Sequence, residues 1–329
     1  MTTARTLILC YHRVSDAPTD PWSLAVTPKN FADQLELLRE RCTPTPLRDL
    51  SRTLGDAPAT RRGVVVTFDD GYADNLHNAK PLLERYEIPA TVFVPTGYVG
   101  QASELWWDEL DRIFLQAGRL PAKLRLKVDG EAREWNLDGA AHYPEEAFRQ
   151  HHAWRAWEEP PAPRQALYLD LYGLLRGRAA GERQRLLEQI VAWAGGSAAA
   201  RPTHRVLTRQ EAAGLEYGEL IQLGAHSVYH PVLSALPVTS QRREIEDSKA
   251  WLEDLLEHPV TTFSYPFGQP SDYTAETIAL IRKAGFECAC ALGEGLVGPT
   301  TDPFRLPRVQ VPDWPRDEFE KRLTEWLAD

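Results

Sequence analysis

The chain has 329 residues, which is enough for one large domain or two modest ones. A hydrophobic content of 43% and a charged content of 26% are typical of an ordinary soluble globular protein. The net charge of −10 at pH 7 argues against nucleic acid or an anionic membrane surface as the main partner, whereas neutral and cationic substrates remain open.

The first predicted element is a strand over residues 6–12, TLILCYH. We expect neither a secretion signal nor a membrane span here, because the apolar run LILC is far too short for either. The four cysteines, Cys10, Cys42, Cys288 and Cys290, lack the spacing of a zinc ribbon. Reduced thiols in a cytoplasmic protein are therefore expected. The sequence carries no indication of an oligomeric state.

Strands and helices then alternate along the chain. Residues 27–41 predict a helix, with Thr27 as its N-cap and Pro28 in its first turn. Further strands are predicted at residues 64–68, 90–96, 220–226, 261–268, 286–292 and 305–311, and further helices at 78–86, 240–256 and 275–283. This alternation of helices with near-continuously apolar strands indicates an α/β fold built on a parallel sheet or barrel.

The alternation breaks between residues 103 and 202. We interpret residues 103–202 as a mainly helical insertion, and residues 1–102 and 203–329 as the barrel domain that carries it. The insertion is expected to contain helices at 105–114, 145–159 and 182–194, a possible hairpin at 124–137 and a linker at 195–202. Its adjacent histidines, His151 and His152, point in different directions on a helix, so a solvated surface is expected rather than a metal site.

Two adjacent carboxylates, Asp69 and Asp70, follow the predicted strand 64–68 and precede a glycine. An Asp-Gly pair is a common turn, and a simple turn is the alternative interpretation. Adjacent carboxylates repel one another, however, unless a cation or hydrogen-bond donors lie nearby. Strand C-termini are also where ligands bind in parallel α/β folds, so this pair is a candidate site.

Two histidines, His226 and His230, follow the predicted strand 220–226. Their spacing of i and i+4 places both imidazoles on one face if the segment forms a helical turn. Two unrelated polar loop residues are the alternative. With one aspartate, the pair would give three protein ligands and one open position, as in catalytic zinc sites. The second aspartate would then be free to act as a base.

These segments resemble the motifs of a known family. TFDDGY at residues 67–72 and HSVYH at residues 226–230 resemble the first two motifs, T-F-D-D-G and H-[S/T]-x-x-H, of the polysaccharide deacetylases, which are carbohydrate esterase family four or the nodulation-protein-B homology domain. The resemblance extends from YHRV through residues 79–99 to LPRVQV, roughly two thirds of the chain, without the insertion. It implies a distorted parallel (β/α) barrel with about seven strands.

The resemblance also implies roles for single residues. Asp69 would be the catalytic base, while Asp70, His226 and His230 would bind one divalent metal. Zinc is the expected metal, with cobalt, nickel or manganese as alternatives. Such a metal lowers the pKa of bound water to roughly 7 and polarises the amide carbonyl. It would also neutralise part of the repulsion between the two aspartates.

The third and fifth family motifs are incomplete in this chain. SYPFG resembles R-x-P-[Y/F], so Pro266 and Phe267 match and the backbone N–H of Phe267 would serve in an oxyanion hole, but Ser264 replaces the arginine that orients the base. LPR resembles L-x-H, but Arg308 replaces the histidine that acts as general acid. Arginine cannot release a proton at usable pH, so the acid must be another residue.

His12 is the candidate for the missing acid. It ends the first predicted strand, and the strands of a parallel barrel present their C-terminal ends to one common face. A residue in this role should titrate near neutrality. A buried, hydrogen-bonded histidine at a strand end is the alternative. Arg308 would then take the other vacant role and hold Asp69 ionised and oriented.

Aromatic residues are candidates for substrate contacts, because sugar rings stack on aromatic faces. Tyr72, Trp106 and Trp107 are therefore expected to line the substrate cleft, together with Pro266 and Phe267. Ordinary packing is the alternative for the tryptophans, of which the chain has 10.

The expected function is metal-dependent hydrolysis of an N-acetyl group from an amino sugar or glycan intermediate. The expected partner is an N-acetylated sugar or glycan, with no nucleic acid and no membrane span. One alternative is another amidohydrolase acting on a cyclic ureide or imide, although the complete set of metal ligands argues against it. The other is a catalytically inactive sugar-binding module, which the two motif gaps keep open.

Overall fold

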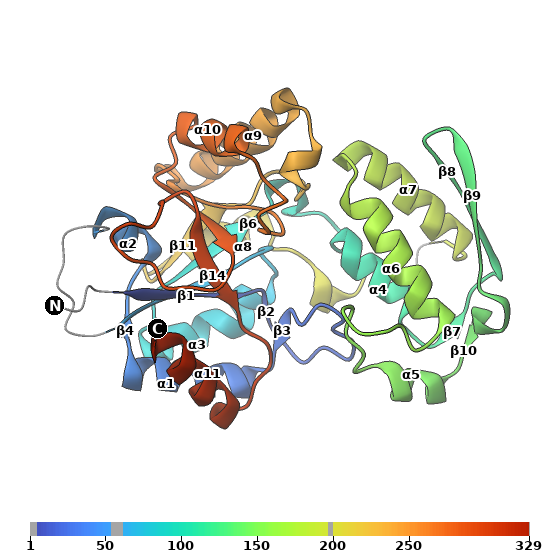
Figure 1. The fold of residues 1–329 in the computed structure, drawn as a ribbon, viewed down its shortest axis with the longest axis horizontal. Helices are drawn as coiled ribbons and strands as arrows, with labels where there is room; N and C mark the ends of the chain where they lie inside the picture. Colours follow the sequence, from blue (N-terminus) through green and yellow to red (C-terminus); the bar gives the residue numbers. More distant parts are fainter. Residues whose placement is uncertain (1–4, 54–61, 197–199, 329) are drawn as a thin grey trace. The chain divides into compact units, whose positions relative to one another are not determined.

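A computed structural model describes residues 5–53, 62–196 and 200–328. Its chain divides into two compact units, coloured by position along the sequence in Figure 1. The barrel unit comprises Met1–Asp16, Leu24–Gln101 and Val206–Asp329, and the insertion unit comprises Ala17–Ser23 and Ala102–Arg205. The predicted linker at 195–202 lies partly outside the described residues.

Seven parallel strands of the described chain close into a barrel, which confirms the predicted fold class. Their order around the barrel is β1-β14-β13-β12-β11-β6-β5, and β5 pairs with β1 to complete the ring. The strands are β1 (Thr6–Tyr11), β5 (Gly63–Phe68), β6 (Ala90–Val94), β11 (Ile221–Ala225), β12 (Thr262–Ser264), β13 (Cys288–Leu292) and β14 (Leu306–Gln310). The short β4 (Thr43–Pro44) pairs with the beginning of β5.

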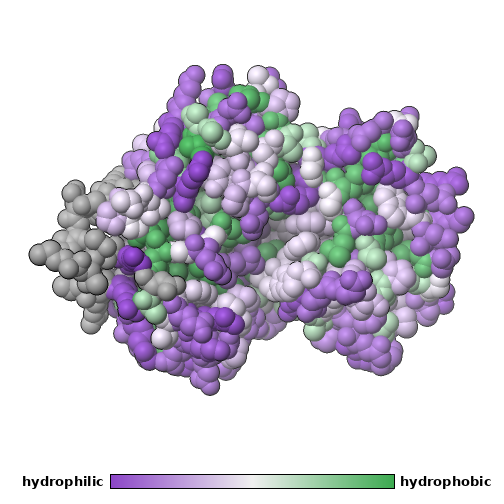
Figure 2. Space-filling model, in the orientation of Figure 1, coloured by the Kyte–Doolittle hydropathy of each residue, from purple (hydrophilic) through white to green (hydrophobic). Residues whose placement is uncertain are grey.

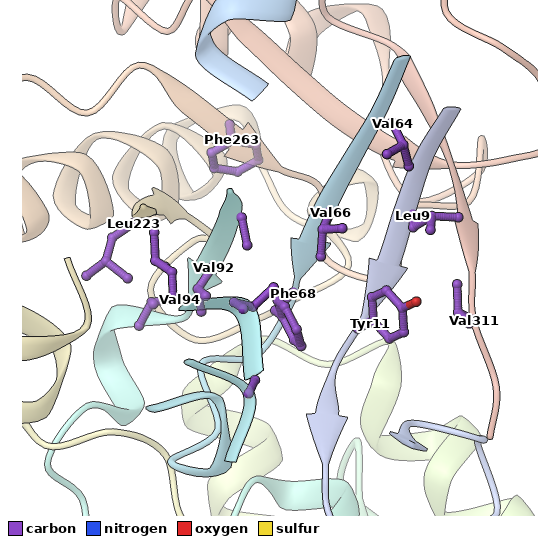
Figure 3. Close-up of a cluster of buried hydrophobic side chains, with 14 of the residues drawn as sticks. Leu9, Tyr11, Val64, Val66, Phe68, Val92, Val94, Leu223, Phe263 and Val311 are labelled. Atoms are coloured by element: carbon purple, nitrogen blue, oxygen red, sulfur yellow. The ribbon is translucent and has the colours of Figure 1, made fainter. Parts of the chain in front are cut away.

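Alternation along each strand separates two sets of buried side chains. One set packs against the surrounding helices, and it includes Leu9 and Tyr11 of β1, Val66 and Phe68 of β5, and Val92 of β6 (Figure 3). The other set points into the barrel and forms a smaller cluster with members Ile8, Val65, Phe93, Cys288, Cys290 and Leu306. All four cysteines are buried and free. Because both faces of every strand are covered, the strands are nearly continuous apolar runs.

The helices of the barrel unit connect and cover these strands (Figure 1). They are α1 (Pro28–Arg41), α2 (Leu47–Thr53), α3 (Lys80–Tyr86), α8 (Arg209–Leu215), α9 (Val238–Leu256), α10 (Ala275–Lys283) and α11 (Arg316–Ala328). The predicted cap is present, because the Thr27 side chain accepts a hydrogen bond from the Asn30 N–H. A small parallel pair, β2 (Arg13–Val14) with β3 (Ala25–Val26), follows β1.

The insertion unit is mainly helical. Its elements are α4 (Trp106–Phe114), β7 (Gly118–Arg119), β8 (Lys123–Val128), β9 (Glu131–Asn136), β10 (His142–Tyr143), α5 (Glu145–His151), α6 (Pro163–Arg176) and α7 (Ala180–Trp193). The hairpin of β8 and β9 turns at Asp129 and Gly130, both with positive φ.

The structure corrects one sequence prediction for the insertion and adds one helix. The helix expected over residues 145–159 ends at His151, because the chain then turns and buries Trp154 against Tyr168. Helix α6 was not predicted, although Leu167, Leu171 and Leu175 give it an apolar face at helical spacing.

The surface drawn in Figure 2 is mostly hydrophilic, with hydrophobic residues in small separate areas. Of the described residues, the large hydrophobic side chains that are exposed are Trp157, Tyr217, Tyr229 and Val238. No helix in the described part of the chain has the length and apolar character that a bilayer crossing requires.

Candidate active site

The candidate residues gather at one end of the barrel. Asp69 follows β5, His226 follows β11 and His12 follows β1, while Ser264 ends β12. All these strands are parallel, so their C-terminal ends share one rim of the barrel. The topology therefore brings together side chains that are separated by up to 252 residues in the sequence, counting from His12 to Ser264.

One cluster consists of Asp70, His226 and His230, each of which can offer one ligand atom within 4.8 Å of the others. The nearest approaches are 3.4 Å from His230 Nε2 to Asp70 Oδ1 and 3.8 Å from His226 Nε2 to the same oxygen. All three side chains are at most 5% exposed. Two imidazole nitrogens and one carboxylate oxygen are the donor set that suits a catalytic divalent metal.

The hydrogen bonding of His226 fixes which of its ring nitrogens faces Asp70. Its Nδ1–H donates to the Ser264 carbonyl oxygen at 2.8 Å, which leaves the Nε2 lone pair directed toward Asp70. Burial lowers the pKa of His226, and although Asp69 and the Ser264 carbonyl oppose this shift, the ring is neutral at pH 7. A neutral imidazole is the form that a metal requires.

The two histidines meet in a way that the sequence did not predict. Residues 226–230 form an irregular turn rather than a helical one, with Ser227 at φ 61° and His230 at φ 52°. The His230 N–H donates to Ser227 Oγ at 3.0 Å and fixes this turn. Left-handed backbone conformations, rather than a helical turn, therefore bring the two rings together. Their centroids are 4.7 Å apart.

Backbone strain is concentrated around this cluster. Besides Ser227 and His230, the non-glycine residues Asp70 and Phe267 have positive φ values of 70° and 62°. A left-handed conformation costs such residues about 1 kcal/mol or more, and it persists only where the surrounding structure enforces it. Strain of this kind is typical of functional sites, which agrees with the ligand geometry.

Neighbouring elements hold residues 226–230, which we term the histidine turn, in place. The Glu244 carboxylate of α9 accepts hydrogen bonds from the backbone N–H groups of Val228 and Tyr229, at 2.8 and 2.9 Å. On the other side, the Gly97 N–H donates to the Val228 carbonyl at 2.8 Å. Sequence analysis missed Glu244, because it lies in the middle of an ordinary amphipathic helix and carries no motif.

Asp69 forms the second part of the candidate site with Arg308. The guanidinium donates two hydrogen bonds to the carboxylate, from Nη1 to Oδ1 at 2.8 Å and from Nη2 to Oδ2 at 2.6 Å. It also donates to Ser264 Oγ at 2.7 Å and to Thr67 Oγ1 at 3.1 Å. Both charged side chains are buried, with 5% exposure for Asp69 and 1% for Arg308.

This pairing determines the charge of Asp69. Burial alone would raise the pKa of the carboxyl, but the charge and hydrogen bonds of Arg308, with a smaller contribution from His226, hold it well below its usual value. Asp69 is therefore ionised at neutral pH. Ser264 Oγ donates a further hydrogen bond to the carboxylate at 3.3 Å. A bidentate pair also fixes the orientation of the carboxylate.

His12 lies beside Asp69, and Cys10, His12 and Asp69 have polar side-chain atoms within 4.8 Å of one another. Its Nδ1 is buried and has no hydrogen-bond partner among the described residues. Burial, reinforced by Arg308 and His226 and opposed by Asp69, lowers the pKa of His12 to about 4. This lowered pKa departs from the expected titration near neutrality, because the sequence could not show the burial of Nδ1. The residue as a whole is half-buried, and its role as the acid stays a prediction.

The aromatic candidates have different surroundings. Phe267 is half-buried, and its ring centroid lies 4.6 Å from that of His230, while the preceding Pro266 is buried. Tyr72 is fully buried, with the Arg13 guanidinium 4.7 Å from its ring centroid.

Trp106 and Trp107 lie on α4 in the insertion unit, with exposures of 2% and 5% and ring centroids 5.3 Å apart. Such burial favours packing within that unit, since an enclosed ring offers little face to a sugar.

Comparison with known proteins gives the same family as the motifs. The chain matches the family model described as polysaccharide deacetylase over residues 56–118 and 197–289. It is 31% identical over 109 residues to YxkH of Bacillus subtilis (strain 168), covering 32% of this chain and 38% of that protein. It is 20% identical over 266 residues to the poly-beta-1,6-N-acetyl-D-glucosamine N-deacetylase of Staphylococcus aureus (strain N315), covering 81% of this chain. The chain spans 59% of the length of that relative.

Solved structures share the fold at low sequence identity. IcaB from Ammonifex degensii superposes with a TM-score of 0.58 at 18% identity, covering 99% of this chain and 98% of that one. The Streptococcus pyogenes deacetylase PplD, solved in complex with acetate, gives a TM-score of 0.57 at 18% identity, covering 98% of both chains. These similarities extend over the insertion unit as well as the barrel unit.

Proposed function

The chain belongs to the polysaccharide deacetylase family, and from this premise we propose that it is a metal-dependent carbohydrate N-deacetylase. It would hydrolyse the amide bond between an acetyl group and the nitrogen of an amino sugar. The main observation in support of the proposal is that the candidate metal ligands and the candidate base are different residues at one rim of the barrel. Asp70, His226 and His230 form a ligand set, while Asp69 is paired with Arg308 and stays available as a base.

The proposed metal is a single divalent ion held by Asp70, His226 and His230. Zinc suits the two nitrogen ligands and one oxygen ligand best, and cobalt, nickel and manganese are the alternatives. When bound, such an ion polarises the acetyl carbonyl and acidifies water. The neutral state of His226 and its bond to Ser264 support this assignment.

Asp69 is the proposed general base. It accepts a proton from the attacking water while the water oxygen bonds to the acetyl carbon. Arg308 keeps the carboxylate ionised and oriented for this step. The nearby Phe267 is proposed to line the site, with its backbone N–H as a donor to the developing oxyanion and Pro266 shaping that turn.

His12 is the proposed carrier of the proton to the leaving nitrogen. A proton on Asp69 would pass to His12, since the pKa of His12 is about 4 and that of Asp69 is held well below its usual value of 3.8. The imidazolium then protonates the nitrogen as the C–N bond breaks, which yields a free amine and acetic acid, and the acid ionises to acetate at neutral pH. His12 would thus be charged only during the reaction.

The proposed substrate is an N-acetylated glycan or glycan intermediate. The Staphylococcus aureus relative is named for deacetylation of poly-beta-1,6-N-acetyl-D-glucosamine, which supports an N-acetylglucosamine chain as the first substrate to test. The net charge of −10 agrees with a neutral or cationic sugar rather than an anionic polymer. A cytoplasmic location stays a prediction, supported by four free cysteines.

The alternatives are less well supported by the site. A cyclic ureide or imide hydrolase without a metal would not need the Asp70, His226 and His230 set. An inactive sugar-binding module would not need an ionised, precisely paired carboxylate beside that set, and the pairing of Asp69 with Arg308 occupies the motif gap that suggested inactivity.

The test is acetate release by purified protein that has been stripped with a chelator and reloaded with zinc, cobalt, nickel or manganese. The panel should contain N-acetylglucosamine, its β-1,6- and β-1,4-linked oligomers and a cyclic ureide. We expect acetate release from the sugars that depends on added metal. Metal-independent turnover of the ureide, or metal binding without acetate release from any sugar, would contradict the proposal.

A further inference from the structure

An exposed aromatic side chain lies between the two histidines of the proposed metal site. Tyr229 directly precedes His230 and is 43% exposed, although its neighbours His226 and His230 are buried at 1% and 5%. A tyrosine that is exposed to this extent leaves part of its ring in water, which forfeits part of the free energy of burial. Its position beside the site suggests that a ligand covers it.

The Tyr229 ring packs closely against the backbone of Gly97. A Cβ placed at Gly97 would lie 2.4 Å from Tyr229 Cε1, so only glycine lets the ring approach this backbone. Tyr98 packs edge-to-face against Tyr229, with ring centroids 6.1 Å apart at an angle of 80°. Tyr98 and Tyr229 together form what we term the tyrosine pair.

The backbone beneath the ring is fixed as well. Glu244 accepts hydrogen bonds from the N–H groups of Val228 and Tyr229, and the flanking residues Ser227 and His230 have left-handed conformations. A ring on such a backbone loses little conformational entropy when a ligand stacks on it. Preorganisation of this kind strengthens binding.

The tyrosine pair also lies on the rim of the barrel that carries the proposed metal site. Strands β6 and β11 are neighbours with Val94 opposite Ala225, and Tyr98 and Tyr229 both come from the segments that follow these strands. These segments are joined by the bond from the Gly97 N–H to Val228. The pair therefore stands at the same end of the barrel as Asp69 and Asp70.

We propose that Tyr229, supported by Tyr98, is a subsite that stacks against the sugar ring adjacent to the one being deacetylated. The inference rests on the proposed function and adds a preference for chains over single sugars. A pyranose presents a face of C–H groups to an aromatic ring, while the tyrosine hydroxyl can bond to sugar hydroxyls. Because the ring lies next to the metal ligands but is not one, it would contact a neighbouring sugar unit rather than the reacting acetyl group.

The test compares hydrolysis of N-acetylglucosamine with that of its β-linked tetramer. We expect wild-type protein to show a higher kcat/KM for the tetramer, and Tyr229→Ala to lower the ratio of tetramer to monomer about tenfold. Tyr229→Phe should keep most of the ratio, since it retains the ring. Tyr217→Ala is the matched control, because Tyr217 is 84% exposed and precedes the same strand at its opposite end.

Two kinetic results would overturn the inference. One is an unchanged ratio in Tyr229→Ala, and the other is an equal loss on both substrates with loss of bound zinc, which would mean that Tyr229 only supports the histidine turn. Zinc content is therefore measured for each variant.

Binding of the tetramer to Asp69→Asn, with and without Tyr229→Ala, is followed by saturation-transfer NMR and separates this inference from the proposed function. If wild-type protein releases no acetate but Tyr229→Ala abolishes tetramer binding, the subsite stands and the N-deacetylase proposal fails. If tetramer binding is unaffected by Tyr229→Ala, the subsite is wrong whatever the activity.

Discussion

Arg308 and Ser264 show that the arginine beside the Asp69 carboxylate can come from a different strand than the family motif places it on. The resemblance expects an arginine at the Ser264 position of β12 and a histidine at the Arg308 position of β14. In the structure the arginine reaches Asp69 from β14, and the small Ser264 side chain bonds to both members of the pair. The Asp69 carboxylate is thus ionised and oriented, although the arginine that orients it lies on β14 instead of β12.

Replacing Arg308 with methionine should show how much the ion pair with Asp69 contributes to turnover and to stability. The buried Asp69 carboxylate would lose its counter-charge, so its pKa should rise and kcat should fall about 100-fold through loss of orientation. The free energy of unfolding at pH 7 should fall by about 3–5 kcal/mol, as for other broken buried pairs. Urea unfolding and steady-state kinetics measure both effects. Arg305→Met, at an exposed position just before β14, is the control.

The loss of stability in Arg308→Met should depend on pH. In wild-type protein the pKa of Asp69 is below its unfolded value of 3.8, so the pair stabilises the fold fully above that pH, and this contribution is lost only as pH falls through the lower folded value. In the variant the folded pKa would lie above 3.8. The difference in unfolding free energy should therefore shrink as pH falls from 7 to 4. A difference that stays constant would mean that Asp69 is not the affected group.

His12→Gln should slow turnover about 10²–10⁴-fold while zinc stays bound. Since the pKa of His12 is about 4, the free protein holds a neutral imidazole throughout the neutral range. The alkaline side of the kcat/KM profile should therefore keep its position in the variant. If the alkaline loss of activity disappears in His12→Gln, His12 is instead protonated in the free enzyme.

At the level of elements, the histidine turn depends on α9. Glu244 supplies the acceptor for two backbone N–H groups of a segment that is otherwise irregular. Groups that orient metal ligands from outside typically change metal affinity 10- to 100-fold when removed. The helix is thus part of the proposed metal site even though it provides no ligand.

Glu244→Ala should therefore weaken zinc binding about tenfold, because the turn that carries His226 and His230 loses its support. Competition with a chromogenic chelator measures the affinity. Glu246→Ala is the matched control, since Glu246 is exposed on the same helix. Equal zinc affinity in both variants would show that the turn holds its shape without Glu244.

The interior of the barrel leaves no room beside Phe93. A Cβ at Gly224 of β11 would lie 2.5 Å from the Phe93 ring and 2.7 Å from Thr262 Oγ1. Gly224→Ala should therefore lower the free energy of unfolding by about 1–3 kcal/mol through overpacking. Gly214→Ala in α8 meets nothing within 4 Å and should instead stabilise by up to about 1 kcal/mol. Thermal unfolding of the two variants should shift in opposite directions.

At the scale of the whole molecule, the barrel and its rim could be predicted because their signals are local. Apolar strands between helices indicate a parallel fold, and TFDDGY and HSVYH name residues that follow two of its strands. The pairing of Arg308 with Asp69 could be inferred because Arg308 lies on one parallel strand and Asp69 directly follows another, and the C-terminal ends of such strands meet at one rim.

Other features depend on contacts between distant segments and left no local signal. The seat of Tyr229 on Gly97, the bonds of Glu244 and the low pKa of His12 all arise from packing that closes only in three dimensions. The left-handed turn between His226 and His230 was mistaken for a helical one, because i, i+4 spacing cannot distinguish the two.

The most direct test of the central claim is a comparison of two neighbouring variants, Asp69→Asn and Asp70→Asn, in zinc content and acetate release. The account predicts that Asp69→Asn keeps one zinc ion per chain but loses about 10²–10⁴-fold in turnover, whereas Asp70→Asn loses the zinc itself. Elemental analysis and kinetics on the same preparations give both numbers. Loss of zinc from Asp69→Asn with zinc retained by Asp70→Asn would reverse the two roles, and wild-type turnover in Asp69→Asn would contradict the account.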